Sequence, residues 1–186
     1  VNGRAAHAGI NPEEGISAIQ IAAHAMAQIP FGKVDADTTA NIGVVNGGHA
    51  TNIVCEKVSL SAEVRSLDHT RALSLAEEFA GCFRGTAAAY SGSAEASTSV
   101  YYPCYHVDSD SQVVLRVQSA LSRLGRPAVF ERSMGGSDAN MFNLHGIESV
   151  CLGAGFEQVH SCRESIALSE LVAAARLVHE LVATEG

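Results

Sequence analysis

The chain has 186 residues, of which 47% are hydrophobic and 17% are charged. This composition supplies ample material for a buried core and argues against a disordered chain. The formal net charge is -8, with twelve basic residues against twenty acidic ones. So few basic residues cannot line a phosphate backbone or an anionic membrane, so we exclude nucleic acid and membrane surfaces as partners and expect small solutes.

The cysteines are odd in number and show no CxxC spacing, which is typical of thiols in a reducing cytosol and not of a disulfide framework. No apolar run approaches the roughly 20 residues that a transmembrane helix needs. No charged leader followed by an apolar block opens the chain. We therefore expect a cytoplasmic protein. The five cysteines are Cys55, Cys82, Cys104, Cys151 and Cys162.

The first part of the chain predicts alternating strands and helices. Its opening residues, VNGRAAHAG, are typical of the inside of a strand and the loop after it, so we expect a piece of a longer protein. Residues 16–29 place apolar side chains at helical spacing and end at Pro30, which cannot continue a helix. Residues 38–45 and 51–67 are strand-like and flank an Asn-Gly-Gly turn at 46–48, which predicts a hairpin.

A second helix and a further strand complete this part. Asp68 can cap a helix over residues 70–90, whose inward side chains include Leu73 and Leu75. Residues 94–102 alternate small and β-branched side chains, as a strand does. The order strand, helix, strand, strand, helix, strand closes into a four-stranded antiparallel sheet with both helices on one face. We predict an α+β chain that begins with this ferredoxin-like βαββαβ arrangement.

The second part predicts a partial α/β segment. Helical periodicity marks residues 111–124, 139–144 and 166–182, and short strand-like runs occupy 128–132 and 149–152. Alternating strands and helices suggest a piece of an α/β sheet. Two strands are too few to cover the apolar faces of such a sheet, so we expect this part to need a partner that the chain lacks.

His160 is a candidate metal ligand in the sequence GAGFEQVHSCRES. A neutral imidazole in a loop after a strand is a common zinc ligand, but a zinc site needs three or four protein donors. When His160 is considered alone, a structural role is therefore favoured over a metal-ligand role. Glu164 can orient its imidazole through a hydrogen bond or can begin the last helix, where a carboxylate is favourable.

A glycine pair marks a second candidate site in the sequence MGGSDANMF, residues 134–142. The glycines allow a tight turn, after which Ser137 or Asp138 can cap a short helix. Capping is sufficient to explain these residues. The functional alternative places Gly136, Ser137 and Asp138 against a substrate or metal pocket, where backbone amides can meet an anion.

Three polar residues of the first part form a third candidate group. His7 follows the first strand and is either a satisfied surface residue or a donor aimed at a charged intermediate. Asn52 and Arg65 offer an amide donor and a planar fork of N–H groups, which together suit an anion. The competing interpretations are a turn-capping asparagine and a solvated arginine, and each is favoured when its residue is considered singly.

The motifs taken together resemble a known family. AAHAGINPEEGISAI, NGGHATNIV, EVRSLD, GGSDANMF and GFEQVHSCRESI occur in this order and at these separations. The combination resembles the later portion of peptidase T-like di-zinc exopeptidases, in the larger family that includes aminoacylase, carnosinase and succinyl-diaminopimelate desuccinylase. The resemblance covers nearly the whole chain.

The resemblance implies a division of the chain and a set of roles. Residues 1–105 are expected to be a ferredoxin-like lid that supports a homodimer, and residues 106–186 the last section of a catalytic domain that binds two zinc ions. His160 matches the last metal ligand of the family. His7 matches the lid histidine that stabilises the tetrahedral intermediate of peptide hydrolysis. Asn52 and Arg65 match lid residues that hold the carboxylate of a short peptide.

The chain also departs from the family pattern. The histidine-x-aspartate ligand pair, the bridging aspartate and the paired glutamates that supply the general base have no counterpart, so we expect the isolated chain to be inactive. Cys55 stands where many relatives carry proline, which affects the turn geometry after the NIV run. Alternative functions are an acylase or desuccinylase of the same superfamily, a non-catalytic dimerisation module derived from the lid, and a small-molecule regulatory domain.

Overall fold

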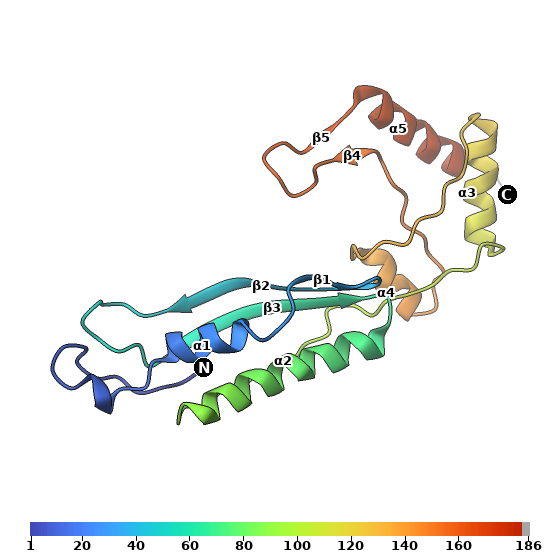
Figure 1. Ribbon diagram of the computed structural model, residues 1–186. Helices are drawn as coiled ribbons and strands as arrows, with labels where there is room; N and C mark the ends of the chain where they lie inside the picture. The colour runs from blue at the N-terminus through green and yellow to red at the C-terminus, as the bar shows by residue number, and fades with distance from the viewer. Residues whose placement is uncertain (184–186) are drawn as a thin grey trace. The chain divides into compact units, whose positions relative to one another are not determined.

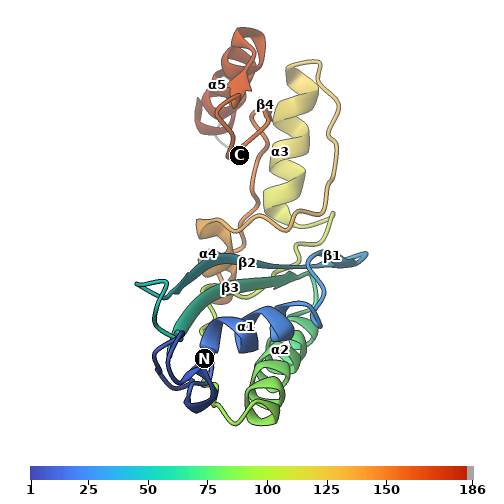
Figure 2. The ribbon, with the colours of Figure 1, turned by 60° about the vertical axis from the view of Figure 1, so that its left-hand side comes forward.

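The computed structural model describes residues 1–183 and divides into two compact units, an amino-terminal unit, Val1–Cys104, and a carboxy-terminal unit from Tyr105 onward. In the amino-terminal unit, helices α1 and α2 lie on the same face of an antiparallel sheet (Figures 1 and 2). The sheet has the order β1-β2-β3. The elements of this unit are the short 3-10 helix Pro12–Glu14, α1 (Ala18–Met26), β1 (Gly32–Asp35), β2 (Thr38–Gly47), β3 (Val58–Ser66) and α2 (His69–Ala89).

Both helices begin at side-chain caps, of which the Asp68 cap was predicted and the Ser17 cap was not. The Ser17 hydroxyl accepts a hydrogen bond from Gln20 N at 3.2 Å and caps α1. Asp68 Oδ1 accepts from Thr70 N at 2.8 Å and from Arg71 N at 3.2 Å and caps α2. These bonds satisfy backbone donors that a helix start leaves without intrahelical partners.

The predicted hairpin is confirmed, but its connection is longer than expected. β2 continues to Gly47, which pairs with Val58, so β3 starts at Val58 and not at residue 51. The intervening residues 48–57 leave the β2–β3 ladder because part of this segment pairs with the amino-terminal segment of the chain. The predicted tight turn at 46–48 is therefore wrong.

The outer strands of the predicted sheet are reduced to bridging pairs. Asn2 pairs antiparallel with Lys57 on one side and with Ser93 on the other, which is the neighbour order of a ferredoxin-like sheet. Residues 94–102, predicted as a strand, have no regular secondary structure. Strand propensity at 94–102 produces no strand because no neighbouring backbone pairs with this run. The unpredicted strand β1 instead extends the sheet beyond β2.

The amino-terminal unit has a conventional core between the sheet and the helices. One buried cluster consists of Ala18, Ala22, Cys55 and Val58. A second consists of Ile29, Ala40, Leu75 and Phe79. The α+β class, with both helices packed on one sheet face, is therefore confirmed for this unit.

Helices provide most of the regular secondary structure of the carboxy-terminal unit. Its elements are α3 (Gln112–Arg123), α4 (Asp138–Leu144), β4 (Phe156–Glu157), β5 (Ser165–Ile166) and α5 (Leu168–Ala183). The predicted helices are confirmed, and an Arg123–Glu180 ion pair joins α3 to α5. The predicted strands at 128–132 and 149–152 are wrong, because in the described chain neither run has a neighbouring strand with which to form a ladder.

Few apolar side chains of the carboxy-terminal unit are buried. Among its described residues, the buried hydrophobic ones are Val114, Ala120, Ala139 and Leu177. Val129 is 75% exposed and Phe130 is 60% exposed. Across residues 1–183, no helix combines the length and apolarity needed to cross a bilayer.

We predict that replacing Leu75 by alanine destabilises the amino-terminal unit by about 2–5 kcal/mol, because the substitution leaves a cavity between α2 and the sheet. Leu75 is 1% exposed. Leu73 lies on the same helix but is 42% exposed, which corrects its predicted inward position. Leu73→Ala is therefore the matched control. Urea denaturation followed by the NMR signals of α2 measures both variants, and equal losses would contradict the assigned core.

Candidate functional site

His7 and Asn52 are brought together by backbone pairing between two distant segments. His7 forms an antiparallel bridge with Ile53. Ala8 N donates to the Asn52 carbonyl at 2.9 Å, and Val54 N donates to the Ala6 carbonyl at 2.9 Å. The side chains of His7 and Asn52 are exposed. Two of the predicted site residues therefore lie at the same end of the sheet, next to the connection between β2 and β3.

A short turn surrounds His7 with hydrogen bonds. Gly9 N donates to His7 Nδ1 at 3.1 Å. His7 N donates to Asn11 Oδ1 at 3.3 Å. The His7 carbonyl accepts from Ile10 N and from Asn11 N, each at 3.2 Å. Both the ring and the backbone of His7 are thus held by the residues that follow it.

Arg65 lies at the opposite end of the sheet. It pairs with Thr39 across the β2–β3 ladder, whereas the β3 end nearest Asn52 is Val58. Val58 and Arg65 are seven residues apart on a strand that rises about 3.3 Å per residue, so about 23 Å separates them. The structure does not bring Arg65 and Asn52 together within one chain.

Arg65 forms a two-point ion pair with Glu63. Its Nε donates to Glu63 Oε1 and its Nη2 donates to Glu63 Oε2, both at 3.1 Å. The hydrogen bond to Glu63 raises the pKa of Arg65, although partial burial opposes this shift. Arg65 is only partly exposed. The ion pair therefore fixes the orientation of the Arg65 guanidinium at this end of the sheet, and the Glu63 carboxylate offsets its charge.

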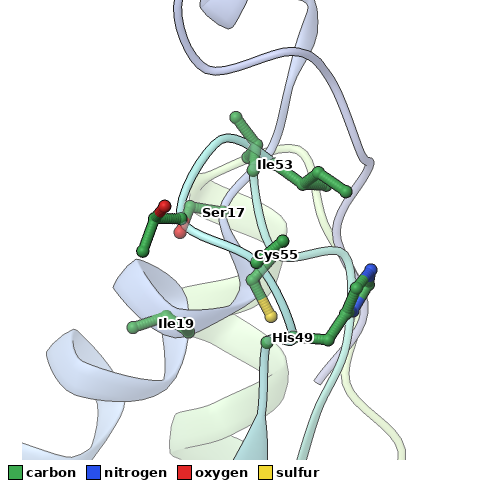
Figure 3. A pocket seen from close by; sticks show the side chains of 9 residues that line it. Ser17, Ile19, His49, Ile53 and Cys55 are labelled. Carbon is green, nitrogen blue, oxygen red and sulfur yellow. The ribbon is translucent and has the colours of Figure 1, made fainter.

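An open depression of about 600 Å³ lies beside the connection between β2 and β3. Figure 3 shows that side chains from the start of α1 and from residues 48–55 line it. This depression was not predicted, because its lining residues carry no recognisable catalytic pattern. The labelled lining residues are Ser17, Ile19, His49, Ile53 and Cys55.

Cys55 closes the inner side of this depression. Its side chain is buried, and its Sγ donates to the Lys57 carbonyl at 3.2 Å. Its carbonyl accepts from Ala18 N at 2.8 Å, which ties the connection to the first turn of α1. The turn at Cys55 is therefore stabilised by hydrogen bonds without a proline.

Gly136, Ser137 and Asp138 lie at the start of α4. Ser137 N donates to Asn140 Oδ1 at 2.9 Å, and Asn140 N donates to the Ser137 carbonyl at 3.0 Å. Asn140 is buried, whereas Gly136 and Asp138 are exposed. The helix-capping interpretation has direct support in these bonds. The contribution of the three residues to a substrate pocket stays a prediction.

His160 lies in the loop between β4 and β5. Its backbone adopts a left-handed conformation with φ of 62°, and its N donates to Glu164 Oε2 at 2.8 Å. Glu164 therefore holds the backbone of His160 and not its ring, and α5 begins only at Leu168. Both predicted roles of Glu164 are corrected by this geometry. Within residues 1–183 the His160 imidazole makes no hydrogen bond, and its side chain is exposed.

The described residues do not form a zinc site by themselves. Across residues 1–183, no three side chains among His, Cys, Asp and Glu cluster in a way that could hold a metal ion. A zinc site needs three or four such donors. His160 can therefore be at most one ligand of a site that other residues complete.

Gly155 positions the hairpin that carries His160. Its φ is +82°, and a Cβ built on it would lie 2.8 Å from Glu170 Cβ. Glu170 in turn pairs with Arg126 at 3.1 Å. The hydrogen bond from Arg126 lowers the pKa of Glu170. The start of β4 therefore packs closely against an ion-paired side chain of α5.

Comparisons with known proteins agree with this arrangement. Residues 1–91 match the family model of the peptidase dimerisation domain, M20_dimer. An uncharacterised Bacillus subtilis protein, YqjE, is 42% identical over 97% of this chain and 48% of its own length. The chain therefore spans about half the length of this curated relative.

Two solved structures are similar over nearly the whole chain. The aminopeptidase PepT from Bacillus cereus is 40% identical with a TM-score of 0.82, and the match covers 97% of this chain and 48% of that one. A tripeptidase from Staphylococcus aureus is also 40% identical, with a TM-score of 0.87 and the same coverage of 97% and 48%.

We predict that Gly155→Ala loosens the hairpin between β4 and β5, because the new Cβ meets Glu170 and the left-handed backbone disfavours alanine by about 1–2 kcal/mol. Gly153→Ala is the matched control, since its Cβ would meet nothing within 4 Å. Hydrogen exchange of the amides of residues 156–166 should accelerate in Gly155→Ala alone. Unchanged exchange would show that the close approach does not constrain the hairpin.

Proposed function

Residues 1–91 belong to the M20 peptidase dimerisation-domain family, and on this premise we propose that the chain is part of a metal-dependent exopeptidase that hydrolyses short peptides. We assign residues 1–105 to the lid and residues 106–186 to the last section of the catalytic domain. The similarity to an aminopeptidase and a tripeptidase over 97% of the chain supports this assignment most strongly. We also propose a cytoplasmic location, because an odd number of cysteines without CxxC spacing is typical of a reducing compartment.

We propose that His160 supplies one ligand to a site for two zinc ions. Its support is an exposed imidazole without a hydrogen bond inside residues 1–183, on a loop whose backbone Glu164 holds. One donor does not make a zinc site. The remaining ligands and the general base are assigned to the portion of the relatives that this chain does not match. The isolated chain is accordingly inactive.

The exposed apolar surface of the carboxy-terminal unit supports the same conclusion. Val129, Phe130 and Leu168 are each at least 60% exposed. Exposed apolar surface on this scale is unfavourable in water, at roughly 25 cal/mol for each Å² left uncovered. We propose that the remainder of a catalytic domain covers it.

We propose that the lid residues act on a short peptide. His7 donates a hydrogen bond to the carbonyl oxygen as negative charge develops there, which stabilises the transition state more than the substrate. The Asn52 amide and the Arg65 guanidinium bind the carboxylate of the peptide. Gly136, Ser137 and Asp138 are assigned to the substrate side of the catalytic segment.

The separation of Asn52 and Arg65 supports a homodimer with shared sites. Asn52 lies in the connection beyond the Val58 end of β3, whereas Arg65 lies near the other end of that strand, so the two side chains of one chain are too far apart to reach a single carboxylate. In a two-fold dimer, a residue of one copy can face a different residue of the other. We propose that His7 and Asn52 of one copy complete a site that contains Arg65 of its partner.

We predict that the purified 186-residue chain does not hydrolyse a tripeptide. A chimera that joins this chain to the unmatched half of the Bacillus cereus aminopeptidase should hydrolyse it. His160→Ala in the chimera should reduce kcat at least about 100-fold and lower the bound zinc, because a metal site that loses a ligand binds metal weakly. His106→Ala, at another exposed histidine, is the control. Chelator-sensitive hydrolysis by the 186-residue chain alone would refute the assignment.

The shared-site arrangement predicts complementation between inactive variants. Asn52→Ala and Arg65→Ala chimeras, each inactive alone, should recover about a quarter of the unmodified activity when unfolded and refolded together, because half the dimers are mixed and each has one intact site. His7→Ala mixed with Asn52→Ala is the control and should recover nothing, since both residues come from the same copy. Recovery in the control mixture, or none in the first, would exclude the shared site.

A further inference from the structure

The turn after His7 selects one proton position on its imidazole. Gly9 N lies 3.1 Å from His7 Nδ1 with a geometry that makes the amide the donor. A backbone N–H has no lone pair to offer, so Nδ1 must be the accepting nitrogen. In a neutral imidazole, the single proton then resides on Nε2.

We propose that the backbone N–H of Gly9 is a positioning group that holds His7 in the Nε2–H tautomer for the peptide carbonyl oxygen. This inference rests on the proposed function. Nε2 has no hydrogen-bond partner within residues 1–183, and the His7 side chain is exposed. A carbonyl oxygen only accepts hydrogen bonds, so it requires the N–H of the imidazole and not its lone pair.

The opposite tautomer would make the site fail in two ways. A proton on Nδ1 would point at the N–H of Gly9, so two donors would face each other. The nitrogen offered to the substrate would then carry a lone pair and repel the developing negative charge. The Gly9 bond therefore lets a neutral histidine act as a directed donor.

The backbone of His7 is held independently of its ring. The backbone N–H of His7 donates to Asn11 Oδ1, and the backbone of His7 pairs with that of Ile53. The imidazole therefore projects from a fixed point of the lid. The ring bond to Gly9 then adds a second constraint, on the rotation of the imidazole. Together these bonds preorganise the donor before a substrate arrives.

Positioning of the His7 ring requires the backbone N–H of residue 9. It does not require that residue 9 be glycine. A Cβ on Gly9 would lie 3.7 Å from His7 Cε1 and 3.8 Å from Nδ1, which are ordinary contacts, and the φ of Gly9 is outside the left-handed region. Gly9→Ala therefore keeps the donor. Gly9→Pro removes it, because proline has no backbone N–H.

Nitrogen-15 NMR of the His7 ring in the 186-residue chain, at a pH where the ring is neutral, tests the proposal. The unmodified chain and Gly9→Ala should show a protonated Nε2 and a lone pair on Nδ1. In Gly9→Pro the ratio of the two tautomers should fall about fivefold, which converts to about 1 kcal/mol, the usual net contribution of a hydrogen bond. A protonated Nδ1 in the unmodified chain, or an unchanged ratio in Gly9→Pro, would overturn the proposal.

Altered amide chemical shifts of Ile53 and Val54 would show that proline disturbs the turn. A second measurement then tests the proposal without the proline variant. Scalar coupling through the hydrogen bond between the Gly9 and Nδ1 nitrogens should be present in the unmodified chain and in Gly9→Ala. Its absence from both would overturn the proposal without any proline variant. These measurements do not involve hydrolysis, so an inactive chimera with the expected tautomer would count against the proposed function alone.

Discussion

The antiparallel pairing of residues 6–8 with residues 52–54 is the contact on which the candidate site depends. Its two flanking hydrogen bonds, Ala8 N to Asn52 O and Val54 N to Ala6 O, join segments that are more than forty residues apart in sequence. This pairing fastens the long connection between β2 and β3 to the start of the chain. It also places His7 beside Asn52 and borders the depression that Cys55 closes.

The two units differ in how many of their apolar side chains they bury. The amino-terminal unit buries apolar side chains between two capped helices and a sheet, so its residues account for their own stability. In the carboxy-terminal unit, the Arg123–Glu180 ion pair joins α3 to α5, while many large apolar side chains remain exposed. Such a surface is typical of a piece that packs against further structure.

Helices were predictable from this sequence and outer strands were not. The cap at Asp68 and the helical spacing that includes Leu75 act within a few residues, so local sequence carries their signal. Residues 94–102 and 128–132 have strand-like composition, yet a strand exists only where another backbone offers matching donors and acceptors. That partner is a property of the tertiary fold.

The amino-acid sequence by itself determined which chemical groups are available: an imidazole at His7, an amide at Asn52, a guanidinium at Arg65 and a solitary imidazole at His160. The tertiary structure decided which of these groups meet. Chain pairing brought His7 to Asn52, whereas the length of β3 carried Arg65 to the other end of the sheet. The physical reason is that residue chemistry is local, while proximity follows from backbone hydrogen bonds between segments remote in sequence.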